Sequence, residues 1–177
     1  MSTDHLATEM QVAVSDRALT FTRFFAAPRE RVFRAWTDPA ELAQWWGPAG
    51  FTNPVSEVDL RPGGAYRIVM RAPDGREFPS TGRYLEIVPP SRLVFTDTIE
   101  DAPGDWLAEF NGHRGAGAAT PYTGEVTVRF DEVDGGTLLT IHTRFASDTD
   151  RDAIIAMGAT SGWSESLERL EALLAGA

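Results

Sequence analysis

The sequence predicts an α+β fold in which a curved antiparallel sheet of about six to seven strands grips a long C-terminal helix. Strand-like segments follow one another between tight-turn signals through the middle of the chain, which is typical of a meander of hairpins. The last segment has helical periodicity, and it is the only predicted element long enough to cover one face of the sheet. A change of period after the first strand predicts two short helices there.

The chain begins its ordered part with one predicted strand over residues 11–25, where apolar and polar residues roughly alternate, with a bend near Asp16. The period then becomes helical. Pro28 suits a first helical turn because its missing N–H needs no partner there. Three residues follow at helical spacing: Val32, Phe33 and Trp36.

A second short helix has a stronger start signal. Asp38 can cap it, Pro39 occupies its first position, and Glu41 stands three residues after the cap. Its apolar stripe consists of Leu42, Trp45 and Trp46. Gly47 and Pro48 then end the helix.

The middle of the chain is predicted to consist of six strands separated by chain reversals. Glycine or proline marks each reversal, and the glycines supply the positive φ that such turns need. The predicted strands cover residues 55–60, 65–71, 78–88, 92–99, 122–131 and 137–145. Residues 102–120 are rich in Gly and Ala, and we expect a long irregular loop there, with Trp106, Phe110 and His113 available to close a cavity.

The C-terminal helix is predicted to begin at Asp148 or Thr149 and to run to the end of the chain. Its apolar stripe is Trp163, Leu167, Leu170 and Leu174, at steps of 4, 3 and 4. Gly158 and Gly162 weaken the upstream part, which indicates that the backbone passes close to a sheet or a ligand there.

Composition excludes several classes of protein. With 177 residues, the chain is expected to form one domain over residues 11–177, preceded by a mobile tail over residues 1–10. It has no cysteine, and its 16 basic residues are all arginines, so thiol chemistry and lysine Schiff bases are impossible. A net charge of −10 disfavours nucleic acid. Since neither a membrane span nor a secretory signal is found, we expect a soluble cytoplasmic protein.

The sequence contains no convincing catalytic or metal-binding motif. Residues 148–152 begin like a calcium-binding loop, but Ala153 and Ala159 replace the glycine and glutamate that such a loop requires. The three histidines are scattered, and His142 is expected to face solvent or the opposite side of the sheet. No metal, cofactor or catalytic residue is therefore predicted.

Several segments, taken in order, resemble the START-like helix-grip superfamily (SRPBCC). Within it, the sequence is similar to the family named for the C-terminal domain of the activator of the heat-shock protein 90 ATPase. The likeness covers residues 18–175 and is carried by residues 28–39 (PRERVFRAWTDP), Leu42 with Trp45 and Trp46, 61–64 (RPGG), 82–87 (GRYLEI), 89–96 (PPSRLVFT), 136–141 (GTLLTI), and Gly162 with Trp163. The resemblance implies an apolar cavity between the sheet and the long helix.

We therefore expect a binding module for a small apolar or aromatic molecule. The aromatic residues are more numerous than one small core usually needs, although core packing explains most of them. The fold itself, which holds side chains apart between sheet and helix, favours a ligand site. The residues predicted to line the cavity are Trp45, Trp46, Phe51, Tyr66, Ile68, Met70, Tyr84, Phe95, Phe110, Met157 and Trp163.

Two alternatives stay open at this point. The first is an enzyme of the polyketide cyclase or hydrolase kind, which would use Tyr66 or Tyr84 with Arg67, Arg83 or His113. Strand alternation weakens any pair of adjacent residues, because neighbours point to opposite faces. The second is a protein-interaction domain, including chaperone assistance. That reading is less favoured, because nothing here matches the N-terminal domain of the chaperone activator. A homodimer is also left open.

Overall fold

A computed structural model of the chain describes residues 7–176. It contains eight strands and five helices. In chain order they are β1 Gln11–Ser15, β2 Ala18–Phe25, α1 Arg29–Thr37, α2 Pro39–Trp45, β3 Thr52–Val58, β4 Ala65–Arg71, β5 Glu77–Val88, β6 Arg92–Ile99, α3 Gly104–Arg114, β7 Tyr122–Val133, β8 Gly136–Arg144, α4 Asp148–Ala156 and α5 Ala159–Gly176.

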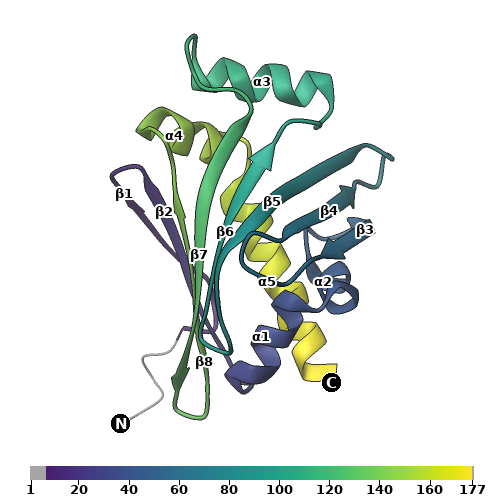
Figure 1. Ribbon diagram of the computed structural model, residues 1–177, viewed down its shortest axis with the longest axis vertical. Coiled ribbons are helices and arrows are strands. Elements are labelled where there is room, and N and C mark those ends of the chain that lie inside the picture. The colour runs from purple at the N-terminus through teal and green to yellow at the C-terminus, as the bar shows by residue number, and fades with distance from the viewer. Residues whose placement is uncertain (1–6, 177) are drawn as a thin grey trace.

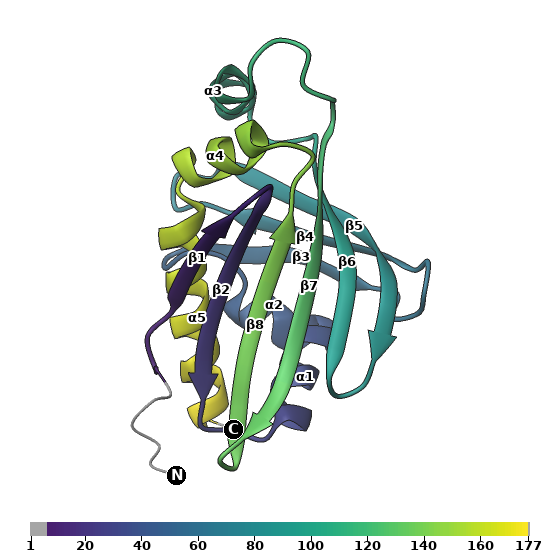
Figure 2. The same ribbon diagram turned by 90° about the vertical axis from the view of Figure 1, so that its left-hand side faces the viewer.

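All eight strands form one antiparallel sheet in the order β1-β2-β8-β7-β6-β5-β4-β3. The sheet curves around α5, which lies against its concave face, while α3 and α4 lie at one end (Figures 1 and 2). The predicted fold class is confirmed. The strand number is higher than expected because residues 11–25 are a hairpin rather than one bent strand. The chain reverses at Arg17, whose φ of 50° is unusual for a residue with a side chain.

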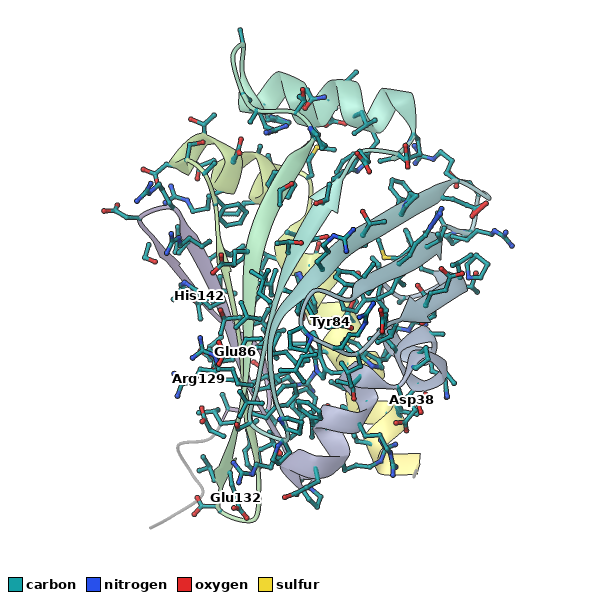
Figure 3. All side chains as sticks on the ribbon, in the orientation of Figure 1. Asp38, Tyr84, Glu86, Arg129, Glu132 and His142 are labelled. Atoms are coloured by element: carbon teal, nitrogen blue, oxygen red, sulfur yellow. The ribbon has the colours of Figure 1, made fainter. Side chains whose placement is uncertain are left out.

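The core lies between the concave face of the sheet and the helices α1 and α5. Strand alternation sends every second residue of β7 inward, including Val126, Val128 and Phe130, all of which are buried. Leu167 and Leu170 of α5 are buried as predicted. Figure 3 shows Tyr84 among the side chains between the sheet and the helix, whereas Arg129 and His142 project from the outer face. There, His142 Nδ1 lies 2.8 Å from Thr20 Oγ1.

The start of α2 forms as the sequence predicts. The Asp38 side chain accepts hydrogen bonds from the backbone N–H groups of Ala40, at 2.9 Å, and Glu41, at 3.1 Å. These two bonds satisfy donors that the first helical turn leaves without partners.

Two helical predictions need correction. Residues 104–114, expected to be irregular, form the helix α3. The predicted single C-terminal helix is divided into α4 and α5 at Gly158, whose φ of +91° is incompatible with a right-handed helix. The N-cap of α4 is Ser147 rather than Asp148 or Thr149, since Ser147 Oγ accepts a hydrogen bond from the Asp150 N–H at 3.1 Å.

Residues 1–6 of the expected N-terminal tail lie outside the described residues. In the part that is described, the Ala7 carbonyl accepts a hydrogen bond from the Phe24 N–H at 3.0 Å. The Thr8 carbonyl accepts another from Arg23 Nε at 2.7 Å. Residues 7 and 8 therefore lie along the end of β2. Within residues 7–176, no helix is long and apolar enough to cross a membrane.

Candidate functional site: an aromatic cavity between sheet and helix

A cavity of about 240 Å³ lies between the concave face of the sheet and the N-terminal half of α5. Seven of the eight strands or their flanking loops, together with α3, α4 and α5, contribute to its wall. Most of the lining is apolar or aromatic. The residues are Leu19, Phe21, Trp46, Gly47, Pro48, Met70, Phe78, Pro79, Ser80, Phe95, Asp97, Ile99, Ala102, Trp106, Tyr122, Val126, Thr143, Phe145, Ile154, Ala159, Gly162, Trp163 and Ser166.

Trp46 and Trp163 form one wall of the cavity, and both contact Trp36 of the core. The rings of Trp36 and Trp163 stack with centroids 6.0 Å apart and planes inclined by 12°. Trp46 meets Trp163 edge to face, with centroids 5.3 Å apart. Such contacts fix the orientation of large rings more tightly than burial alone.

Arg169 of α5 holds the loop that carries Trp46. Its Nη1 donates to the carbonyl oxygens of Trp46, Gly47 and Pro48 at 3.1, 2.9 and 3.1 Å. Its Nη2 donates to the Gln44 carbonyl at 3.0 Å. These carbonyls include ones at the end of α2 that lack a partner within the helix. A single guanidinium therefore ties α2 and the cavity wall to α5.

The helix α3 covers the end of the cavity next to α4. Trp106 lines the cavity, and its ring lies 5.1 Å from that of Phe110. Arg114 follows Trp106 and Phe110 at the same four-residue spacing along α3, and its Nε donates to Asp150 Oδ1 of α4 at 2.8 Å. His113 is exposed and lies 4.0 Å from Glu109, so it does not face the cavity.

One carboxyl group interrupts the apolar lining. Asp97 of β6 lies between Phe95 and Ile99 on the inward face of the strand, and Ser80 Oγ donates to its Oδ1 at 2.8 Å. Burial raises the pKa of Asp97, while the Ser80 hydrogen bond opposes that shift. Asp97 is the only charged residue among those that line the cavity.

Tyr122 brings a hydroxyl group to the same wall. Burial and the nearby charge of Asp97 raise the pKa of its hydroxyl. Gly124, which pairs with Asp97 across β6 and β7, leaves room for that hydroxyl, because a Cβ there would lie 2.7 Å from Tyr122 Oη.

The predicted site residues fall into three groups. Trp46, Met70, Phe95 and Trp163 line the cavity. Tyr66, Ile68 and Tyr84 lie on the other side of Phe95, where they border a separate space of about 10 Å³. Neither space is lined by Trp45, Phe51, Phe110 or Met157. Trp45 is instead a core residue whose indole N–H donates to the Ala35 carbonyl at 2.9 Å.

The two tyrosines considered for catalysis are packed in the core. Tyr66 Oη donates to the Thr96 carbonyl at 2.7 Å, and burial, with the charge of Asp97, raises its pKa well above the usual value. Burial raises the pKa of Tyr84 to about 12. Arg67 and Arg83 are exposed on the opposite face, so neither tyrosine has an arginine partner from its own strand.

The sequence reasoning missed Asp97, Ser80 and Tyr122. The signal for Asp97 was present, since Phe95, Asp97 and Ile99 alternate along one strand and must share a face. Among the residues that the structure describes, no group of three or more histidine or acidic side chains is placed to hold a metal ion.

Comparison with known proteins identifies relatives over nearly the whole chain. The model of the family described as "Activator of Hsp90 ATPase homolog 1-like protein" matches residues 26–175. No curated protein matches the chain.

Solved structures are similar along most of their length. A protein from Rhodobacter sphaeroides is 28% identical, with a TM-score of 0.79, and the match covers 96% of this chain and 99% of that one. Protein Ms6760 from Mycobacterium smegmatis is also 28% identical, with a TM-score of 0.77 and coverage of 94% and 96%. Protein CV1439 from Chromobacterium violaceum is 32% identical, with a TM-score of 0.69 and coverage of 89% and 96%.

Proposed function

Since this chain belongs to the family of Activator of Hsp90 ATPase homolog 1-like proteins and has the START-like fold, we propose that it binds a small apolar or aromatic molecule between the sheet and α5. The cavity of about 240 Å³, with its tryptophan wall, is the observation that carries this proposal. Family membership alone does not choose a function, because one fold supports many activities.

The energetic cost of an empty cavity supports a bound ligand. At about 24 cal/mol per Å³, leaving this volume dry would cost roughly 6 kcal/mol, which is comparable to the whole stability of an ordinary domain. Water gains little against aromatic and aliphatic walls. A molecule that fills the space restores the missing contacts.

The size of the cavity limits the ligand. Ligand pockets typically measure about 300–1,000 Å³, so this one lies at the small end. A molecule with one or two rings fits such a volume. The aromatic rings in the lining, including those of Trp46 and Trp163, favour an aromatic molecule.

Binding is better supported than turnover. In the described part of the chain, Tyr66 and Tyr84 lie outside the cavity wall and His113 points away from it. A cyclase-like reaction using those residues is therefore disfavoured. Chaperone assistance rests on the family description alone, whereas the cavity is a feature of this chain.

Native mass spectrometry of the freshly purified protein, followed by denaturing extraction, tests the proposal. We expect a small-molecule adduct at one per chain, or saturable binding of naphthalene. The Val126→Trp variant, which fills the cavity from β7, should abolish either signal. Val12→Trp on the exposed strand β1 is the matched control and should leave it unchanged.

Two results would contradict the proposal. One is a bare mass together with no saturable binding of naphthalene. The other is full binding by a folded Val126→Trp variant, which would place the ligand elsewhere. Turnover of an added aromatic ester or polyketide-like compound by the wild type would instead favour an enzyme.

A further inference from the structure

We propose that the ligand is an amine: a planar apolar molecule whose protonated nitrogen pairs with Asp97 while its rings lie against the tryptophan wall. This inference rests on the proposed ligand cavity and adds the chemical class of the ligand. Three observations carry it. Asp97 is the charged residue in the described cavity wall, one of its two carboxylate oxygens has no hydrogen-bond donor among the described residues, and aromatic residues line the same cavity.

The carboxyl group of Asp97 lacks a counter-ion. Within residues 7–176, no arginine or histidine pairs with it, and Ser80 is the only donor that hydrogen-bonds to its side chain. Ser80 donates to Oδ1, no donor among the described residues bonds to Oδ2, and Asp97 lines the cavity. A carboxylate removed from water requires donors or a cation, so a ligand that supplies both gains most from this position.

The rings around Asp97 favour a cation as well. Phe95 is the nearest inward neighbour on the same strand, and Trp46, Trp106, Tyr122 and Trp163 also line the cavity. Aromatic faces carry a partial negative charge and attract ammonium groups, the more strongly when water is excluded. A carboxylate and several ring faces around one small space therefore select for a protonated amine.

Anionic ligands are disfavoured for the same reason. Among the described residues, no arginine or histidine lines the cavity, so a carboxylate or phosphate would enter without a cation and face Asp97. The net charge of −10 repels anions and attracts cations at longer range. A neutral acceptor could bond to a protonated Asp97 or to the hydroxyl groups of Tyr122 and Thr143, but without a charge-assisted hydrogen bond.

Strand pairing leaves space beside the Asp97 carboxyl group. Asp97 faces Gly124 across the β6–β7 pair, and Gly124 has no side chain of its own. The Tyr122 hydroxyl occupies the space next to Gly124 and has no hydrogen-bond partner among the described residues. It can accept a second hydrogen bond from the same ammonium group.

The test compares two probes of the same shape. 1-Naphthylmethylamine is protonated at neutral pH, and 1-naphthalenemethanol replaces its ammonium group by a hydroxyl. By calorimetry at pH 7 and moderate salt, we expect the wild type to bind the amine at least about tenfold more tightly, the difference that a charge-assisted hydrogen bond supplies. The Asp97→Asn variant keeps the shape of the side chain and should lose this preference while still binding the alcohol.

Glu125→Gln is the matched control. Glu125 is exposed and faces outward from the strand β7, and its substitution changes the net charge by the same amount as Asp97→Asn. It should retain the preference for the amine. If Asp97→Asn fails to fold, Asp97→Leu removes the charge with an apolar residue and serves the same comparison.

Each remaining outcome overturns the inference. Equal or tighter binding of the alcohol by the wild type means that no cation is recognised, although the ligand cavity stands. A preference that survives in Asp97→Asn assigns the amine to another group. If neither probe nor naphthalene binds, the cavity proposal fails and this inference fails with it.

Discussion

Arg114 of α3 and Asp150 of α4 form an ion pair, 2.8 Å from Nε to Oδ1, with side-chain exposures of only 2% and 7%. The guanidinium also donates to Asn111 and to the Ala119 carbonyl, and it lies over the ring of Tyr122, 5.5 Å from the centroid. The pair therefore joins α3, which covers the cavity, to α4. The Arg114 guanidinium also packs against the ring of Tyr122.

Removing one member of this pair should be costly. Arg114→Met leaves Asp150 buried without its cation, so we expect the free energy of unfolding to fall by about 3–5 kcal/mol. Urea unfolding measures this change, and hydrogen exchange over residues 104–114 reports whether α3 is released before the rest of the protein. Arg76→Met removes an exposed partner of Asp105 on the same helix and should cost about 0–1 kcal/mol.

The double variant Arg114→Met with Asp150→Leu isolates the cause. Replacing both charges by apolar side chains removes the unpaired charge, so most of the lost stability should return. A double variant less stable than Arg114→Met would show that packing and the bonds to Ala119 and Asn111, rather than the ion pair, account for the loss.

Features encoded by neighbouring residues could be predicted from the sequence. The Asp38 cap, the strands after Pro48 and the apolar stripe of α5 depend on spacings of a few residues. The β1–β2 reversal was missed because Arg17, rather than glycine or asparagine, adopts the positive φ. The helix α3 was missed because its inward stripe, Trp106 and Phe110, ends in the charged Arg114.

The cavity depends on contacts between distant strands, which the sequence does not display. Tyr66, Ile68 and Tyr84 point to the concave face as expected, but the curvature of the sheet places them against Trp36 and Leu42 in a filled part of the core. The open part of the concave face is the cavity lined by Asp97 and Tyr122. Alternation assigns a residue to a face, and only the packing of α3, α4 and α5 decides which part of that face stays open.

Asp97 should make stability fall as the pH rises. Burial raises its pKa in the folded protein above the ordinary 3.8, so between 3.8 and the raised value the native state holds more protons than the unfolded state. The stability that this group contributes is present below 3.8 and is lost as the pH rises through the raised pKa. Asp97→Asn should lack this loss and become increasingly more stable than the wild type across that window.

Chemical unfolding between pH 3.5 and 8 measures the free energies of unfolding of the wild type and of Asp97→Asn. Because all other titratable groups are shared, the difference between the two free energies reports on Asp97. Glu125→Gln controls for the change in net charge, because Glu125 is exposed. A difference that is constant with pH, or that shrinks as the pH rises, would show that the folded protein does not disfavour the ionised Asp97.

Two glycines should respond oppositely to alanine. A Cβ at Gly82 of β5 would overlap the Thr96 carbonyl oxygen and lie 2.8 Å from Tyr66 Cε1, so Gly82→Ala should cost about 3 kcal/mol or more. Gly112 lies exposed within α3 with no atom within 4 Å of such a Cβ. Gly112→Ala should therefore stabilise the protein by about 0.5–1 kcal/mol. Urea unfolding measures both, and a loss in Gly112→Ala would contradict the assignment of residues 104–114 to a helix.

Arg169→Met should weaken both the fold and ligand binding. Methionine keeps an apolar stem of similar length but leaves the carbonyls of Gln44, Trp46, Gly47 and Pro48 without their donor, at a cost of about 2–3 kcal/mol. Because these carbonyls flank Trp46, the cavity wall should loosen, so naphthalene should bind more weakly and Trp emission should shift to longer wavelength. Arg34→Met, at an exposed position on α1, is the matched control. Unchanged naphthalene binding alongside the lost stability would mean that Arg169 supports α2 without shaping the cavity.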